Sequence, residues 1–309
     1  MNPAVAGGGE KSGMERKDRI DALGATALIV FSFLMGLNQV LIKIVNTGFA
    51  PVFQAGLRSA CALGPVLLFA ILMRRRLSVG DGSLVPGLLC GLFFSLEFML
   101  LFKALDYTTV SRASVLFYTM PVWVAVAAHF LIQGEHLNGR RVLGLVLAVA
   151  GVCLAFLDRP AIVDDSALLG DLMCLVGAIF WAGIALLART TVLSRSSPEM
   201  QLVYQLAVSA VLLLLLAPLF GELIREVTPR IAGIFAFQTI VVVCVGFLSW
   251  FWVLRIYPAS DMAAFSFLAP VFGVLLGWLV LNEPITPAIF GALVLVGAGI
   301  ALVSWRPRR

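Results

Sequence analysis

The chain has 309 residues, of which 61% are hydrophobic and 13% charged, with a net charge of +5 and a mean hydropathy of +1.03. A soluble domain has about 45–50% apolar and about 25% charged residues, so this composition excludes one. The basic residues are dispersed along the chain, which argues against a nucleic-acid partner. All five cysteines lie in apolar runs without CxxC spacing and predict neither a disulfide framework nor a metal site.

Apolar runs of about the length that a helix needs to cross a bilayer, roughly 20 residues, follow one another along the chain. Residues 1–21, which are polar and contain three consecutive glycines, are predicted to be a cytosolic tail rather than a signal peptide. Residues 158–167 are predicted to form an outer loop and residues 306–309 a second cytosolic tail. We predict an all-α membrane protein with ten spans, at residues 22–45, 52–73, 84–105, 110–133, 140–157, 168–190, 200–220, 230–255, 260–281 and 287–305.

The distribution of lysine and arginine predicts the orientation of these spans. If the N-terminus is cytosolic, the cytosolic segments carry fifteen basic residues and the outer segments carry five. Basic residues accumulate in cytosolic segments of membrane proteins. An even number of spans with both termini in the cytosol therefore follows.

The two halves of the chain repeat each other. Matched residues occur in the same order at offsets that vary only between 146 and 149, and each half contains five spans. Because five is odd, the second half enters the membrane from the opposite side, which is the inverted repeat that many secondary transporters use for alternating access. We take residues 22–157 as the first repeat and 168–305 as the second; the matched pairs include Ser111 with Ser260, Pro121 with Pro270, Glu135 with Glu283 and Gly144 with Gly291.

Each half carries a proline in its fourth span, then a Gly-Glu or Asn-Glu pair, then a last span with glycines. These residues are Met120-Pro121, Gly134-Glu135, Gly144 and Gly151 in the first half, and Ala269-Pro270, Asn282-Glu283, Gly291 and Gly299 in the second. The pattern resembles the EamA repeat, and two tandem copies resemble the drug/metabolite transporter superfamily. Within it the chain looks most like ten-helix bacterial exporters of aromatic and neutral amino acids. The resemblance implies a carrier in the bacterial inner membrane, but members of similar pattern export amino acids, metabolites and drugs.

Charged side chains inside a bilayer are costly and are therefore functional candidates. Arg58 and Glu97 are expected at similar depth in the outer half of the first repeat, with Lys43 and Lys103 nearer the outer ends of their spans. In one interpretation Arg58 or Lys43 binds a substrate carboxylate, and Glu97 binds an ammonium group or a coupling proton. In the other, Arg58 and Glu97 form a structural ion pair, and the lysines extend to the lipid headgroups.

The remaining candidates are neutral. We expect Asn38, Gln39, Tyr118, Trp181, Gln238 and Trp250 to line a mostly apolar substrate site. Pro121 and Pro270 lie at equivalent places in the two repeats and are predicted to be paired hinges, because proline interrupts the hydrogen bonds of a helix.

These features predict a secondary carrier that exports amino acids or related small metabolites. A proton-coupled drug or metabolite exporter is the alternative, and a membrane-embedded enzyme or a channel-like protein is a third class. The chain has no HExxH, GxSxG or Walker A motif, so we expect no catalysis, cofactor or ATP-driven pumping. Facilitated diffusion or exchange is favoured, since a carboxylate paired with Arg58 stays ionised and carries protons poorly. The expected partners are a small-molecule substrate and membrane lipid, and the sequence is compatible with a monomer.

Overall fold

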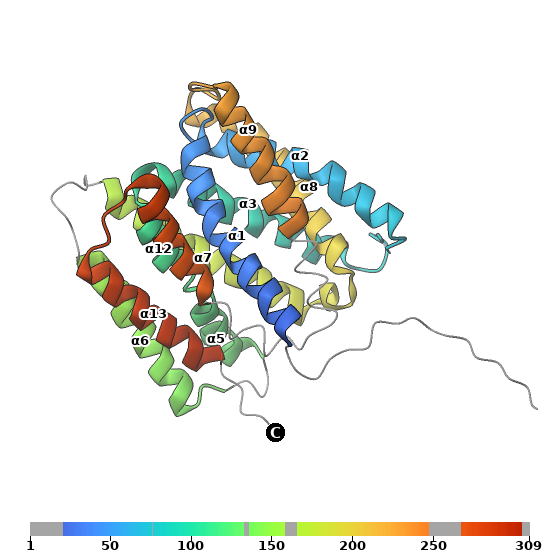
Figure 1. Cartoon of the computed structure of the whole chain (residues 1–309). Helices are drawn as coiled ribbons and strands as arrows, with labels where there is room; N and C mark the ends of the chain where they lie inside the picture. Colours follow the sequence, from blue (N-terminus) through green and yellow to red (C-terminus); the bar gives the residue numbers. More distant parts are fainter. Residues whose placement is uncertain (1–20, 76, 133–135, 158–165, 247–266, 305–309) are drawn as a thin grey trace, which may run out of the picture.

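The computed structural model describes residues 21–75, 77–132, 136–157, 166–246 and 267–304 (Figure 1). Trp250 and Glu135 lie outside the described residues, as do most of the two tails and of the loop after the fifth span. The helices are α1 (Ala22–Val45), α2 (Pro51–Leu72), α3 (Leu84–Tyr107), α4 (Val110–Phe117), α5 (Met120–Leu131), α6 (Gly139–Leu157), α7 (Ser166–Thr190), η1 (Val192–Arg195), α8 (Pro198–Leu216), η2 (Ala217–Phe220), α9 (Pro229–Phe237), η3 (Gln238–Val245), α12 (Leu268–Leu281) and α13 (Pro287–Ser304).

The described part of the chain agrees with the expected ten spans. Eight helical segments in it are long and apolar enough to cross a membrane, and two shorter apolar ones, 229–245 and 268–281, occupy the eighth and ninth spans. The eighth span ends in η3, a π-helical stretch. The fourth span consists of two helices, α4 and α5, rather than one. The all-α membrane fold expected from hydropathy is therefore confirmed.

Short polar residues before the apolar runs determine where several helices begin. Asp21 accepts a hydrogen bond from the Gly24 amide at 2.9 Å, and Ser197 accepts one from the Met200 amide at 3.2 Å. Thr228 does the same for Ile231 at 3.3 Å. Each side chain satisfies one of the backbone donors that a first helical turn leaves free. Proline follows Ser197 and Thr228, at a position where its missing N–H costs nothing.

The packing of helices reproduces the sequence repeat. Each of the second, fourth and fifth spans packs on its counterpart in the other repeat: α2 on α8, α4 on α12, and α6 on α13. Figure 1 shows α6 and α13 side by side. The contact of α1 with α12 also has its counterpart in the contact of α7 with α4. If each helix is replaced by its counterpart in the other repeat, the same set of helix contacts results. The repeat in the sequence is therefore also a repeat of the fold.

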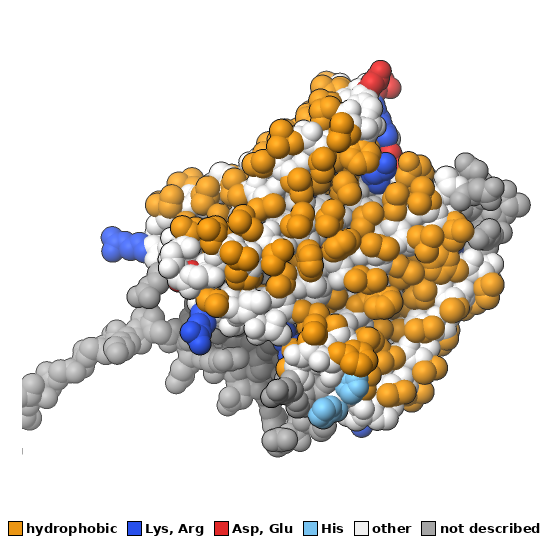
Figure 2. Space-filling model, turned by 180° about the vertical axis from the view of Figure 1, so that it is seen from behind, with side chains coloured by type: hydrophobic (Ala, Val, Ile, Leu, Met, Phe, Trp, Pro, Cys, Tyr) orange, Lys and Arg blue, Asp and Glu red, His pale blue; other side chains and the backbone are white. Residues whose placement is uncertain are grey.

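The surface of the bundle is apolar (Figure 2). Large hydrophobic side chains on several helices are more than half exposed, among them Leu68, Phe130, Leu215 and Phe290. The few charged side chains on the face shown in Figure 2 lie toward its margins. Such a surface is suited to lipid rather than to water.

The two ends of the bundle carry separate polar networks. At the Lys43 end, defined by the connections 46–50, 108–109, 221–228 and 282–286, the Ala50 amide donates to the Leu223 carbonyl at 3.0 Å, and Lys43 lies 3.6 Å from Glu283. At the Arg75 end, defined by 73–83 and 191–197, Arg75 lies 3.2 Å from Glu199. In a protein with ten spans, successive connections lie on alternate sides of the membrane, and these connections are grouped in that way. The sequence predicts that the Lys43 end faces outward.

That orientation can be tested with single cysteines. Thr47 lies at the Lys43 end and Ser78 at the Arg75 end, and both are exposed. We expect a membrane-impermeant maleimide to label Thr47→Cys in intact cells, and to label Ser78→Cys only after permeabilisation, because charged reagents do not cross the bilayer. The unsubstituted chain, with its five native cysteines, supplies the background. Labelling of Ser78→Cys alone in intact cells would reverse the predicted orientation.

The crossing of α6 and α13 yields a stability prediction. A Cβ atom at Gly299 would lie 2.6 Å from the Gly144 carbonyl oxygen, whereas a Cβ atom at Gly297 would meet nothing within 4 Å. Gly299→Ala should lower the free energy of unfolding in detergent by about 1–3 kcal/mol, because the added methyl group forces the backbones apart. Gly297→Ala, on the same helix, should not lower it. Equal effects of the two substitutions would contradict a close crossing here.

Candidate functional site

Polar side chains converge in the interior of the bundle from four spans. Asn38 and Gln39 come from α1, Arg58 from α2, Glu97 from α3 and Gln238 from the first residue of η3. Gln39, Arg58, Glu97 and Gln238 are each at most 3% exposed. π-Helical stretches are rare and often occur at functional sites, and η3 begins at one of these side chains.

Hydrogen bonds connect this cluster across the two repeats. Asn38 Oδ1 accepts from Arg58 Nη1 at 3.4 Å and from Gln238 Nε2 at 3.1 Å. Gln54, which the sequence analysis did not single out, donates from Nε2 to Gln238 Oε1 at 3.4 Å. Asn38, Gln54 and Arg58 belong to the first repeat and Gln238 to the second. The site therefore lies between the repeats, as expected for a carrier that alternates access.

The guanidinium group of Arg58 is held between aromatic rings. Its central carbon lies 4.4 Å from the centroid of the Phe98 ring and 4.7 Å from that of Phe102. Such contacts stabilise a desolvated cation. Asn38 is the one hydrogen-bond acceptor that the described residues offer to Arg58. A guanidinium group has five N–H donors, and the described residues leave most of them unused.

Several buried polar atoms on α1, α2 and α3 have no hydrogen-bond partner among the described residues. They are Glu97 Oε2, Gln39 Nε2, Gln54 Oε1 and the Ser59 hydroxyl. An unsatisfied buried polar group costs about 1–3 kcal/mol, and more when it is charged. Four such atoms from three helices are difficult to explain by stability, and they fit a site that binds a polar ligand.

Arg58 and Glu97 do not form the direct ion pair that one interpretation of the sequence predicted. They are close enough to interact electrostatically, but no salt bridge joins the two side chains within the described part of the chain. The cluster thus presents a cation and an anion that the protein leaves separate.

Aromatic rings border the anionic side of the cluster. Tyr118, in the break between α4 and α5, lies close enough to Glu97 for an electrostatic interaction. The rings of Tyr118 and Trp181 are 5.8 Å apart, and Phe117 stacks on Trp181 at 5.1 Å. These rings provide an apolar surface next to the charged groups.

The two predicted hinge prolines begin helices rather than bend them. Pro121 is the second residue of α5, just after the break at Tyr118 and Thr119, and Pro270 is in the first turn of α12. Proline cannot donate a backbone hydrogen bond, so Pro121 leaves the Phe117 carbonyl without the bond that a continuous helix would supply. Their matched positions agree with the repeat, and the hinge role remains a prediction.

Lys43 lies away from the cluster. Its ammonium group donates to the Thr108 carbonyl at 2.5 Å and faces Glu283 Oε1. Lys43 thus neither lines the central site nor extends freely to the headgroups. Lys103, the other lysine of the first repeat's spans, lies 4.5 Å from the centroid of the Phe220 ring.

Glu283 joins the second repeat to the first helical turn of α4. Its two carboxylate oxygens accept from the Val110 amide at 2.8 Å, the Ser111 amide at 3.0 Å and the Ser111 hydroxyl at 3.0 Å. Asn282, with φ of 54°, turns the chain so that Glu283 lies against Gly277, where a Cβ atom would be 2.7 Å from Oε2. A carboxylate is favoured at a helix N-terminus. We call the contact of Glu283 with Val110, Ser111 and Lys43 the Glu283 latch.

A second ion pair at this end was missed in the sequence. Arg112 and Asp171 are both at most 5% exposed, and Arg112 Nε lies 3.1 Å from Asp171 Oδ2. Thr108 donates its hydroxyl to Asp171 Oδ1 at 2.7 Å. The pair was not predicted, because its two residues are 59 positions apart and no local pattern indicates the contact.

Comparisons with known proteins identify the family. A model of the EamA-like transporter family matches residues 22–157 and 168–305. The chain belongs to this family. It is 29% identical over 275 residues to the uncharacterized transporter YoaV of Bacillus subtilis, covering 88% of this chain and 94% of the relative. It is 26% identical over 306 residues to a probable amino-acid metabolite efflux pump of Escherichia coli, covering 95% and 98%.

A crystal structure that is 19% identical supports the EamA-like fold alone. It aligns with a TM-score of 0.63 and covers 91% of this chain and 98% of the other. The chain is therefore a multi-pass membrane protein of a transporter family. The described geometry adds a buried cluster between its repeats and a latch at one end.

The latch yields a prediction about local stability. Glu283→Gln replaces one carboxylate oxygen by an N–H₂ group, which cannot accept from α4, and it removes the charge facing Lys43. We expect loss of about 1.5–3 kcal/mol of local stability, the contribution of one charge-assisted hydrogen bond. Amide exchange in a peptide covering the start of α4, followed by mass spectrometry, should become about 10–150-fold faster.

Glu226→Gln is the matched control. Glu226 is an exposed carboxylate at the same end without a partner among the described residues, so its substitution should leave exchange at α4 unchanged. Unchanged exchange in Glu283→Gln as well would show that the latch does not hold α4.

Proposed function

We propose that this chain exports amino acids or related small metabolites across the bacterial inner membrane by alternating access between its inverted repeats. The observation that carries the proposal is the burial in one cluster of Arg58 and Glu97, which no salt bridge joins. The described residues leave most of the Arg58 donors unused and one Glu97 carboxylate oxygen without a partner. An amino acid carries a carboxylate and an ammonium group on the same carbon, and these charges are complementary to those of Arg58 and Glu97. Its carboxylate suits the planar guanidinium group, and its ammonium group suits Glu97.

The aromatic border supports the choice of substrate. A ligand that bridges Arg58 and Glu97 would place its side chain near Tyr118, Phe117 and Trp181, which are apolar and offer few hydrogen-bonding groups. This composition is typical of sites that bind an apolar body through a few directing polar groups. Aromatic and neutral amino acids fit it better than acidic or basic ones. The similarity to the probable amino-acid metabolite efflux pump of E. coli points the same way.

The latch supports alternating access. It closes the Lys43 end by joining α1, α4 and the connection after α12, which come from both repeats. In the proposed cycle, substrate is bound from the cytosol and released after these contacts separate. The predicted orientation, with both termini cytosolic, assigns the Lys43 end to the outside. The proposed mode is facilitated diffusion or exchange, with proton-coupled drug or metabolite efflux as the alternative. No salt bridge joins Arg58 and Glu97 among the described residues, so the ion pair that favoured the first mode does not support it, and a pH gradient has to decide between them. The proposal includes no catalytic step.

Counterflow of radiolabelled phenylalanine and leucine in proteoliposomes tests the substrate. Arg58→Gln and Glu97→Gln should each raise the half-saturating concentration about 10–100-fold, because each removes a charge-assisted contact to the substrate. Lys103→Gln removes a charge near the Lys43 end of α3 without touching the cluster, and it should transport normally. Absence of counterflow for every amino acid in the unsubstituted protein would refute the amino-acid proposal.

The same vesicles test coupling. Under facilitated exchange, an imposed pH gradient should leave the initial rate of counterflow unchanged. A rate that follows the gradient and loses this dependence in Glu97→Gln would instead identify Glu97 as a proton carrier. The unsubstituted protein without a gradient is the reference for both results.

A further inference from the structure

Amide side chains between the repeats form a hydrogen-bonded chain that ends at Arg58. Gln54 of α2 donates to Gln238 of η3 at 3.4 Å, and Gln238 donates to Asn38 of α1 at 3.1 Å. Arg58 of α2 donates to the same Asn38 oxygen at 3.4 Å. Gln54 and Gln238 are fully buried. Side chains from both repeats thus determine the surroundings of one guanidinium group.

The direction of this chain follows from Arg58. A guanidinium group donates hydrogen bonds and accepts none, so Asn38 must turn its oxygen toward Arg58. The group that Gln238 offers to that oxygen has to be its N–H₂ group, which leaves the Gln238 oxygen to accept from Gln54. Gln54 ends the chain with its own oxygen, which has no partner among the described residues. Each amide therefore has one orientation that suits its neighbour.

Gln238 is the closer of the two donors that hold the Asn38 oxygen. N–H···O bonds are usually about 2.7–3.2 Å long, so the bond from Arg58 is long and the bond from Gln238 is not. The terminal torsion of an asparagine is soft, and rotation about it would turn the N–H₂ group of Asn38 toward the donors of Arg58. The bond from Gln238 opposes this rotation. Without it, the Phe98 and Phe102 rings would be the main restraint that the described residues place on Arg58.

Stability alone does not account for these amides. Apolar side chains of similar shape could join α2 to η3 without leaving a buried oxygen unpartnered, as the Gln54 oxygen is among the described residues. A buried polar network that is only partly satisfied is costly in a medium of low polarity. The π-helical stretch η3 also begins at Gln238, and such stretches are frequent at functional sites. Both observations favour a role in the site.

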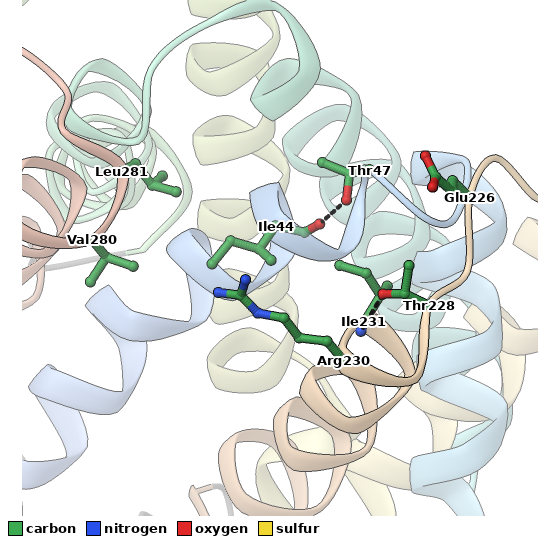
Figure 3. Close-up of a pocket in the computed structure, with 8 residues that line it drawn as sticks. All are labelled: Ile44, Thr47, Glu226, Thr228, Arg230, Ile231, Val280 and Leu281. Carbon is green, nitrogen blue, oxygen red and sulfur yellow. Dashed lines mark hydrogen bonds between the residues drawn. The ribbon is translucent and has the colours of Figure 1, made fainter.

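Arg230, near the start of the same span as Gln238, is an arginine without such a restraint. It lies in the first turn of α9 and lines a pocket of about 370 Å³ at the Lys43 end. In Figure 3 its side chain reaches toward Ile44, and no hydrogen bond or ion pair joins it to another described residue. Arg230 therefore provides an internal reference for a guanidinium group that rotates freely.

We propose that Gln238 is a positioning residue: it fixes the amide of Asn38 and, through it, the guanidinium plane of Arg58 that receives the substrate carboxylate. The role of Arg58 toward a carboxylate rests on the proposed function, whereas its orientation by Gln238 does not. Gln238 belongs to the second repeat and Arg58 to the first. The affinity of the site therefore depends on how the repeats meet, because a displacement of η3 from α1 breaks the chain.

Nitrogen NMR of the arginine side chains tests the orientation without a substrate. In the full chain labelled with ¹⁵N-arginine and purified in detergent, the signals that disappear in Arg58→Lys belong to Arg58. Its two Nη atoms should give separate signals, because a restrained guanidinium group rotates slowly, whereas those of Arg230, assigned with Arg230→Lys, should be averaged. Gln238→Met keeps a side chain of similar length without its hydrogen bonds, and it should broaden or merge the Arg58 signals. Unchanged Arg58 signals would overturn the proposal.

Counterflow tests the consequence for the substrate. Gln238→Met should raise the half-saturating concentration of phenylalanine about 2–10-fold, the loss expected for one neutral hydrogen bond, and leave the maximal rate unchanged. Gln54→Met, one bond further from Arg58, should have a smaller effect of the same kind. Gln201→Met is the matched control, since Gln201 of α8 donates to the Leu193 carbonyl at 2.8 Å, at the Arg75 end. It should leave the half-saturating concentration unchanged.

Asn38→Asp distinguishes positioning from a structural role. A carboxylate presents an oxygen to Arg58 whichever way it turns, so it does not need Gln238 to orient it. In the Asn38→Asp background, Gln238→Met should therefore change the half-saturating concentration by less than about twofold. A packing defect at Gln238 would instead have its full effect in both backgrounds. Equal effects in the two backgrounds would contradict the positioning role.

These measurements separate the two proposals. If counterflow is present and Gln238→Met leaves either the Arg58 signals or the half-saturating concentration unchanged, the positioning proposal fails and the proposed function stands. If counterflow is absent for every amino acid, the proposed function fails, and the Arg58 signals of Gln238→Met decide on the positioning role. If Gln238→Met does not fold, Gln54→Met takes its place in both measurements, because it removes the donor that orients Gln238.

Discussion

A helix that starts inside a packed bundle must find acceptors for its first backbone N–H groups. Thr109 accepts from the Arg112 amide of α4, and the other repeat supplies the acceptor for the first two amides. Glu283 accepts from Val110 and Ser111, and its remaining charge is balanced by Lys43. Because a bilayer supplies no water to replace these bonds, the start of α4 depends on the connection that follows α12. The folding of one repeat is thereby linked to a single carboxylate of the other.

The same constraint applies to the polar cluster at the centre of the bundle. At the Lys43 end, buried charges meet matched partners, as in the pair of Arg112 with Asp171. Around Arg58 they do not, and buried oxygens and nitrogens are left without partners among the described residues. In a medium of low polarity an unpaired charge is more costly than a paired one. Unpartnered buried atoms also occur at the two ends, at Asn46 Oδ1 and Ser196 Oγ. What distinguishes the centre is the presence of two opposite charges, Arg58 and Glu97, that no salt bridge joins among the described residues.

Much of the fold follows from the sequence because the bilayer sets both the length of each span and its composition. The ends of α1 and α7 were predicted to within two residues from apolar runs alone. The break between α4 and α5 was not, since the residues on both sides are apolar and only Pro121 indicates it. Hydropathy detects a membrane segment without showing whether the helix in it is continuous.

Part of the candidate site could be predicted from the sequence, because the few polar residues inside apolar runs are natural candidates. Asn38, Arg58 and Gln238 were selected in this way, and the structure brings them together. Gln54 has the same signal, one helical turn before Arg58, and was missed. Glu283 was not recognised as the cap of α4, because Val110 is 173 residues away. Contacts across the repeat interface are a property of packing, which no local pattern encodes.

The short helix α4 connects these regions physically. Its first turn is held by Glu283, the Ser114 hydroxyl donates to Gln39 at 2.6 Å, and it ends at Tyr118 beside the aromatic border. Gly273 of α12 packs so closely on Ser114 that a Cβ atom there would overlap its hydroxyl oxygen. With eight residues and close contacts along its length, α4 is more easily displaced as a unit than bent. A displacement of α4 that changes the surroundings of Gln39 would therefore also change the contacts of Glu283, which is the kind of coupling between an internal site and one end that the proposed alternating access needs.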